Sequence, residues 1–231
     1  MASVDTIQIT VPGRGGHGAV PDQTVDALVA ASALVLNLQT FVSRNVSPLK
    51  EEVITVGAFH SGISENIIAN RAELKGTVRT LDSEIREQFP EWIQRTVENS
   101  YRAFGATGQI DYQKRVPVLS NDPQAAVWIY RSAERLLGEA SVTETDLTLG
   151  GDDIALMLER VPGCYFRLGA TPPDRPVRGW HSPHFNIDEN SPSVGSAMLT
   201  QIALDYLFGH VGQESPDLGY ETMKGSRSKW A

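Results

Sequence analysis

The sequence is poor in cysteine: Cys164 is the only one in 231 residues. A single cysteine excludes an internal disulfide framework and any zinc module built from several cysteines. We therefore expect a reducing, cytoplasmic setting. The opening "MASVDTIQIT" lacks the basic start and apolar run of a signal peptide, and no stretch approaches the length needed to cross a bilayer. No membrane partner is expected.

Basic residues are also scarce, since 20 Lys and Arg stand against 28 Asp and Glu, for a net charge of −8. A protein that binds the phosphate backbone of nucleic acids needs a basic face, so no nucleic-acid partner is expected. Hydrophobic residues make up 41% and charged residues 21% of the chain. These values are ordinary for a soluble globular protein with one large or two modest domains.

The first half of the chain shows alternating strand patterns and helical periodicities. The expected strands are 6–11, 53–60, 71–79 and 108–119, and the expected helices are 25–44 and a second one after Asp82. Thr24 is the expected cap of the first helix, with Asp26 in its first turn. Pro90 should kink the second helix or delay its start. The order β-α-β-β-α-β is the ferredoxin-like arrangement and predicts a complete domain over residues 5–118.

The strand 71–79 has the cleanest alternation, with Ala72, Leu74, Gly76 and Val78 on one face. The other face carries polar or charged side chains, including Arg79 at its end. This pattern predicts a sheet with one buried and one solvated face.

The second half predicts helices over 121–138, 150–161 and 191–208, with Asn121 as the cap of the first. Residues 163–171 read as one short buried strand. One strand with three helices cannot easily bury its edges, so residues 119–209 are expected to be a partial α/β domain. Residues 210–231 are polar and aperiodic and are expected to be disordered.

Three stretches could carry chemistry. "GRGGHGAVP" (13–21) presents His17 on a glycine-rich loop, where a histidine can act near neutral pH, although a plain surface histidine is commoner. Asn66 in "SENIIAN" is a turn former or an oxyanion donor. Arg79 is a solvated sheet residue or a guanidinium fork for a carboxylate.

The third stretch, "GWHSPHFNIDE" (179–189), places His181 and His184 ahead of two acids on a rigid loop. Histidines fixed by turns are good metal-ligand candidates. The spacing nevertheless matches no self-sufficient metal site, and no HExxH is present. Asp152 and Asp153 are a second acidic pair, but acids at a helix start are usually caps.

These residues carry a resemblance. "GRGGHGAVPDQTVD", "ITVGAFHSG", "SENIIAN", "AELKGTVRT", "LGGDDIA" and "GWHSPHF" occur in the order and spacing of the M20 metallopeptidase family, up to about residue 209. The chain resembles the amidohydrolase branch that acts on N-acyl amino acids, of the hippurate, aminoacylase and auxin-conjugate hydrolase type. The resemblance implies a metal-binding catalytic domain interrupted by a ferredoxin-like lid that dimerises.

The resemblance also implies roles. His17 matches the lid histidine that reaches the partner subunit's active site and stabilises the oxyanion. Asn66 and Arg79 match lid residues that engage the substrate, with Arg79 on its carboxylate. His181 matches the last ligand of a divalent metal such as zinc or manganese. A homodimer and a small N-acyl amino acid substrate follow as expectations.

The departures from the family pattern limit these expectations. The other metal ligands and the catalytic glutamate of the family lie in an N-terminal half that the sequence lacks, so Met1 resembles an internal methionine. The family's "GGED" is "GGDD" here, and Ile154 replaces the aromatic residue that follows. Two alternatives to a truncated amidohydrolase stay open: a non-catalytic dimerisation or regulatory module, and a metal-independent ester hydrolase using His17 or His184. The latter has no GxSxG to supply a serine.

Overall fold

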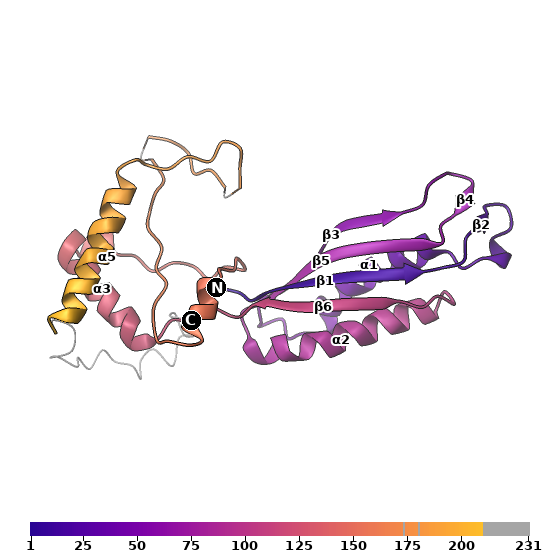
Figure 1. Ribbon diagram of the computed structural model, residues 1–231, viewed down its shortest axis with the longest axis horizontal. Helices are drawn as coiled ribbons and strands as arrows, with labels where there is room; N and C mark the ends of the chain where they lie inside the picture. Colours follow the sequence, from indigo (N-terminus) through magenta and orange to yellow (C-terminus); the bar gives the residue numbers. More distant parts are fainter. Residues whose placement is uncertain (173, 180, 210–231) are drawn as a thin grey trace. The chain divides into compact units, whose positions relative to one another are not determined.

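The computed structural model describes residues 1–209 except 173 and 180 (Figure 1). Two compact units are present. The first comprises Met1–Leu119 together with Leu147–Met157, and the second comprises Ser120–Asp146 and the chain from Leu158 onward. The segment that carries "GGDD" therefore groups with the first unit, although it lies beyond residue 118 in the sequence.

The first unit is built on an antiparallel four-stranded sheet. Its strands are β1 (Val4–Pro12), β3 (Glu52–Ser61), β5 (Arg71–Thr80) and β6 (Gln109–Val116), in the spatial order β3-β5-β1-β6. The helices α1 (Ala27–Asn45) and α2 (Ser83–Arg102) connect them and pack together. The predicted ferredoxin-like order is thus confirmed.

The helix starts differ in part from the sequence prediction. Asp26, rather than Thr24, is the N-cap of α1, because its carboxylate accepts hydrogen bonds from the backbone N–H groups of Leu28 and Val29. Asp82 caps α2 in the same way. Pro90 lies inside α2 and does not delay its start, which remains at Ser83.

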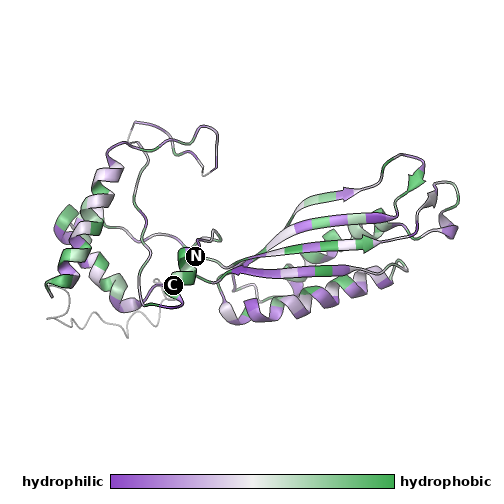
Figure 2. Ribbon diagram, viewed as in Figure 1, coloured by the Kyte–Doolittle hydropathy of each residue, from purple (hydrophilic) through white to green (hydrophobic). Residues whose placement is uncertain are grey.

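The core lies between the sheet and the two helices. Hydrophilic and hydrophobic residues alternate along the strands (Figure 2), and Ala72, Leu74 and Val78 are at most 1% exposed, as the pattern of β5 predicts. Helix α1 is long and apolar enough to cross a bilayer by length and composition alone, contrary to the expectation from the sequence. Core helices of folded domains share these properties, and six α1 residues are buried here.

A buried carboxylate stands at the base of the sheet. Asp5 is fully buried and receives hydrogen bonds from Arg86 at 2.8 and 3.1 Å, from the Tyr112 hydroxyl at 2.9 Å and from the backbone N–H of Arg115 at 3.1 Å. Burial and the neighbouring Asp5 raise the pKa of the Tyr112 hydroxyl. This charge is therefore paired and hydrogen-bonded, as a buried charge must be.

Glu52, at the start of β3, is poorly satisfied by comparison. Its Oε1 is buried without a hydrogen-bond partner, and burial, followed by the charges of Asp82 and Glu51, raises the pKa of its carboxyl to about 7. Because the folded-state pKa lies above the ordinary 4.5, its contribution to stability is complete below that value and is lost as pH rises through about 7.

We expect Glu52→Gln to remove this loss. The free energy of unfolding of the variant, relative to the parent, should rise by about 1 kcal/mol between pH 5 and pH 8 after allowance for solvent screening. Urea denaturation across this range measures it. Glu91→Gln, at an exposed position of α2 whose charge does not act on Glu52, is the control and should show no such trend. Parallel pH profiles for parent and Glu52→Gln would contradict the prediction.

The second unit contains α3 (Pro123–Leu137), the short turn η2 (Glu139–Ser141) and α5 (Ser191–Leu207). Helices α3 and α5 pack together through the rings of Trp128 and Tyr206, whose centroids lie 5.9 Å apart. The Ser132 hydroxyl also donates a hydrogen bond to the Asp205 carboxylate. Asp205 also pairs with Arg135. Its ion pair and hydrogen bond satisfy a second buried carboxylate.

Three sequence predictions for this half need correction. Asp122, not Asn121, caps α3 by accepting from the backbone N–H of Ala125. The helix expected over 150–161 shrinks to α4 (Ile154–Leu158). Residues 163–171 do not form a strand, because no other strand lies alongside to bond with them within the described residues. The disorder expected for 210–231 falls outside the described residues.

Candidate functional site

A small two-stranded antiparallel ribbon extends one end of the sheet in the first unit (Figure 1). Strand β2 (Gly16–His17) pairs with β4 (Ile67–Ile68), so that His17 lies opposite Ile67. The backbone N–H of Gly18 donates to the carbonyl of Asn66 at 2.8 Å. His17 and Asn66, two candidate site residues 49 positions apart in the sequence, are thereby brought together.

The glycines of "GRGGHG" make this pairing possible by close approach. A Cβ at Gly13 would lie 2.3 Å from the carbonyl oxygen of Val25, and one at Gly15 would lie 2.7 Å from that of Ile68. Neither glycine has positive φ, so both are needed for space rather than for a left-handed turn. The loop is thus held between β4 and the residues just before α1.

The ring of His17 is oriented by its own loop. The backbone N–H of Ala19 donates to Nδ1 of His17 at 3.1 Å, and the residue is exposed. In a neutral imidazole, an acceptor at Nδ1 places the proton on Nε2. Nε2–H therefore points away from the loop as a donor, which is the form that can stabilise a developing oxyanion.

Asn66 follows Ser64 and Glu65 and lies immediately before β4. The Ser64 hydroxyl lies 3.0 Å from Oδ1 of Asn66 and 3.2 Å from a carboxylate oxygen of Glu65. Hydrogen bonds from its own backbone N–H and from Ser64 lower the pKa of Glu65. When the Ser64 hydrogen serves Oδ1, the amide NH2 of Asn66 is the end left to donate to a ligand. Sequence reasoning missed Ser64, whose only signal was its place two residues before Asn66.

Arg79 lies at the opposite end of the sheet from the β2–β4 ribbon. Its Nη1 donates to the backbone carbonyl of Leu149 at 2.9 Å, which joins it to the segment carrying "GGDD". The eight residue-to-residue steps from Arg71 to Arg79 span about 26 Å at the rise of a β-strand. The structure therefore brings His17 and Asn66 together and leaves Arg79 far from both.

His181 belongs to the second unit. It is exposed and is the one non-glycine residue with positive φ, 62°, in the described part of the chain. Such strain often accompanies function. No group of three or more His, Cys, Asp or Glu side chains that could hold a metal ion is present among the described residues. The residues described do not by themselves fit a divalent metal, which needs several fixed ligands.

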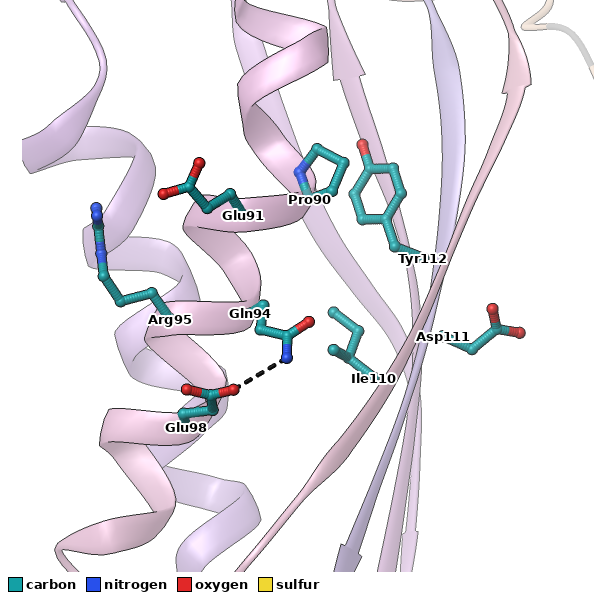
Figure 3. Close-up of a pocket in the computed structure, with 8 residues that line it drawn as sticks. All are labelled: Pro90, Glu91, Gln94, Arg95, Glu98, Ile110, Asp111 and Tyr112. Carbon is teal, nitrogen blue, oxygen red and sulfur yellow. Dashed lines mark hydrogen bonds between the residues drawn. The ribbon is translucent and has the colours of Figure 1, made fainter.

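A groove of about 550 Å³ lies between α2 and β6 (Figure 3). Charged and polar side chains of α2 line one wall, where Gln94 donates to Glu98 at 2.9 Å, and Ile110, Asp111 and Tyr112 of β6 line the other. No candidate site residue lines it. The groove is therefore separate from the site formed by His17 and Asn66 on the β2–β4 ribbon.

Comparisons with known proteins agree with this fold. Residues 3–104 match the peptidase dimerisation domain of M20 enzymes. The chain is 33% identical over 204 residues to an N-acetylcysteine deacetylase of Bacillus subtilis, covering 88% of this chain and 52% of that protein. It is 36% identical over 200 residues to an N-acetyldiaminopimelate deacetylase of Anoxybacillus flavithermus, covering 87% and 52%.

A solved structure of an M20 peptidase shares this fold. A dinuclear metal binding peptidase of the M20 family from Bacillus subtilis is 27% identical, with a TM-score of 0.69, and the match covers 90% of this chain and 51% of that one. The first unit thus contains a peptidase dimerisation domain. Residues 3–104 carry the dimerisation domain of M20 peptidases, and most of the chain is similar to deacetylases and peptidases of that family. It spans about half the length of the relatives it matches.

Proposed function

We propose that the chain is the lid and part of the catalytic domain of a metal-dependent amidohydrolase that cleaves N-acyl amino acids or related small amides. Residues 5–118 form the lid and 119–209 contribute to the catalytic domain. The expected cytoplasmic location belongs to this proposal. Its main support is the β2–β4 ribbon that brings His17 and Asn66 together, along with the similarity of the chain to deacetylases.

The β2–β4 ribbon supplies the hydrogen-bond donors that an amide hydrolase needs at the reacting carbonyl. The Nε2–H of His17 donates to the oxygen that becomes negative in the tetrahedral transition state. The amide of Asn66, held beside it by the β2–β4 pair, donates a second hydrogen bond to the substrate. Arg79 binds the free carboxylate of the amino acid through its guanidinium fork.

The distance between these groups favours a homodimer. A small N-acyl amino acid cannot touch His17 and Arg79 of one protomer when about 26 Å of β5 separates them. If the β2–β4 ribbon of a second protomer reaches the site near Arg79, the substrate can contact His17 of one protomer and Arg79 of the other. We therefore propose that His17 and Asn66 act in the partner's site while Arg79 acts in its own.

The outer face of α1 supports the same assembly. Leu36 is 68% exposed, and Leu28, Val29 and the nearby Phe59 of β3 are also exposed. Only 33% of the apolar stretch of this helix is buried within the protomer. A contiguous exposed apolar surface indicates a protein interface, and a symmetric dimer is the commonest way to cover one. We propose that α1 and the β3 edge form this dimer interface.

Leu36→Glu is expected to dissociate the dimer, because it places a charge in an apolar interface. Light scattering coupled to gel filtration should give the mass of one chain for the variant and of two for the parent. Gln88→Glu adds the same charge at an exposed polar position of α2, outside the proposed interface, and serves as control. A dimeric Leu36→Glu variant would move the interface elsewhere.

The family's divalent metal would activate water and polarise the amide carbonyl in the complete enzyme. His181 is the described residue proposed as one of its ligands. The described residues hold no further group of ligands beside it, so they do not hold the metal by themselves. The remaining ligands are proposed to come from the half of the relatives that this chain does not match.

A hydrolysis assay tests the function. The chain, co-expressed with the unmatched part of the Bacillus subtilis N-acetylcysteine deacetylase and supplied with Zn²⁺ or Mn²⁺, is expected to release acetate from N-acetyl amino acids. Amidating the substrate carboxylate should raise KM by about tenfold or more, because the charged partner of Arg79 is lost. Hydrolysis that persists in a strong chelator would instead favour the metal-independent esterase, and a dimer without hydrolysis would favour the non-catalytic module.

A further inference from the structure

Strand β6 forms one edge of the four-stranded sheet, and β3 forms the other. It has eight residues, Gln109–Val116, and β1 is its only strand neighbour among the described residues. An edge strand presents a row of backbone N–H and C=O groups to which another extended chain can add. The proposed dimer interface uses α1 and the β3 edge and does not involve β6.

The hydrogen bonds of β1 show which of its residues face β6. The N–H of Ser3, just before β1, donates to the carbonyl of Thr80 at 2.8 Å. Just after β1, the N–H of Gly13 donates to the carbonyl of Asn70 at 2.9 Å. In an extended strand the N–H and C=O of one residue point to one side, and those of the next residue point to the other. The odd-numbered residues of β1 therefore face β5, and the even-numbered ones face β6.

The same alternation identifies the outward-facing positions of β6. Gln8 of β1 lies opposite Asp111, so the backbone groups of Asp111 face β1. Ile110 and Tyr112, on either side of Asp111, then turn their N–H and C=O groups outward. Beyond the pairing within the sheet, no backbone hydrogen bond in the described part of the chain engages these two residues. An added strand could exchange a pair of hydrogen bonds with each of them.

The groove of about 550 Å³ between α2 and β6 lies beside this edge (Figure 3). Ile110 and Tyr112 give it an apolar wall, and Gln94 points from α2 toward Ile110. Residues directly opposite each other on paired strands project their side chains to the same face. A residue that pairs with Ile110 would therefore direct its side chain into the groove, next to Gln94 and its hydrogen-bond partner Glu98.

The charges around the groove favour a basic occupant. Its lining residues include three carboxylates and one guanidinium: Glu91, Glu98, Asp111 and Arg95. Figure 3 shows the Arg95 side chain pointing away from β6 and the Asp111 side chain pointing away from α2. Lys114, further along β6, is paired with Glu87 at 2.6 Å. A basic strand beside β6 would thus meet Glu98 on one face and Asp111 on the other.

We propose that β6 and α2 form a docking site for an extended basic peptide of another protein. The peptide adds to the sheet as a strand, exchanges main-chain hydrogen bonds with Ile110 and Tyr112, and places a lysine or arginine beside Glu98. In such strand addition the main-chain hydrogen bonds supply affinity and the side-chain contacts supply specificity. The proposal is independent of the proposed function, because neither His17, Arg79 nor the metal takes part.

A synthetic peptide tests the strand pairing. The probe is fluorescein-labelled TVTKTVT with a C-terminal amide, in which the two valines and the central lysine share one face. N-methylation of the lysine removes an N–H that faces β6, whereas N-methylation of the following threonine removes one that faces away. Fluorescence anisotropy with the full chain should show the first change weakening binding about tenfold or more relative to the second. Equal losses, or no binding of the unmethylated peptide, would overturn the proposal.

Charge changes test the preference for a basic peptide. Replacing the central lysine of the probe by glutamate should weaken binding about fivefold or more, and Glu98→Gln should weaken binding of the lysine peptide about threefold. Glu84→Gln makes the same change at an exposed residue of α2 that does not line the groove, and is the control. Equal affinity for the lysine and glutamate peptides would overturn the proposal. Binding that needs the lysine but tolerates both N-methyl groups would replace strand addition with a small-cation site.

Hydrogen exchange locates the contact. In the full chain saturated with the lysine peptide, the amides of Ile110 and Tyr112 should exchange about tenfold or more slowly than in the chain alone. Peptide binding without this protection would place the peptide elsewhere. Protection that is already present without peptide would show that a second copy, or the chain itself, covers the edge. Either result would overturn the proposal.

Discussion

Replacing His17 by alanine is expected to lower kcat of the metal-loaded assembly by about 10²–10³-fold with little change in KM, as the loss of one oxyanion donor does. The reason is that Nε2–H, oriented by the bond from Ala19 to Nδ1, bonds to the substrate oxygen most strongly in the transition state. Steady-state kinetics on N-acetyl amino acids measure it. Gln109→Ala, at an exposed position of β6 on the opposite edge of the sheet from β3, is the control.

Hybrid dimers then decide which subunit uses His17. Protomers carrying His17→Ala and Arg79→Ala are given different tags, and the dimer containing one of each is isolated. If the two residues serve different subunits' sites, one of the two sites keeps both, and activity should return to about half of the parent value. A hybrid as inactive as either single variant would place both residues in the site of one protomer.

Replacing Asp5 by alanine is expected to lower the free energy of unfolding by about 3–5 kcal/mol. The change leaves the Arg86 guanidinium, whose side chain is only 11% exposed, without its carboxylate, and leaves the Tyr112 hydroxyl without its acceptor. Urea denaturation followed by circular dichroism measures the loss. It is large because a buried charge without a partner costs more than the pair contributes.

An exposed ion pair in the same unit serves as the comparison. Glu87 pairs with Lys114, and its side chain is 68% exposed. Glu87→Ala should therefore lower stability by at most about 1 kcal/mol. An Asp5→Ala variant that loses no more than this would show that water reaches Arg86 and that the cluster is not a structural anchor.

The fold of the first unit was predictable because its signals are local. The alternation in β5 assigns Ala72 and Leu74 to the buried face before any partner is known. The same parity in β1 places Asp5 with Ile7 and Ile9, so a buried charge at the base of the sheet could also have been inferred from the sequence.

The remainder depended on contacts that no local pattern carries. Residues 163–171 have the composition of a strand, but a strand exists only where another backbone is available to bond with it. The helix cap moved from Asn121 to Asp122 because the Asn121 amide bonds to Tyr165 instead.

For the candidate site, the glycines near His17 indicated a close approach but not its target. Strands β2 and β4 have two residues each, too short for any periodicity, so the meeting of His17 with Asn66 could not be read from the sequence. The roles given to both residues came from the resemblance to M20 enzymes.

The lone cysteine has a practical consequence for work on assembly. Burial raises the pKa of the Cys164 thiol to about 11. At pH 7.5 roughly three molecules in ten thousand then carry the thiolate, the form that attacks other sulfur atoms. Air oxidation is therefore expected to be slow at this position, and a dimer held by contact is expected to persist when reductant is added.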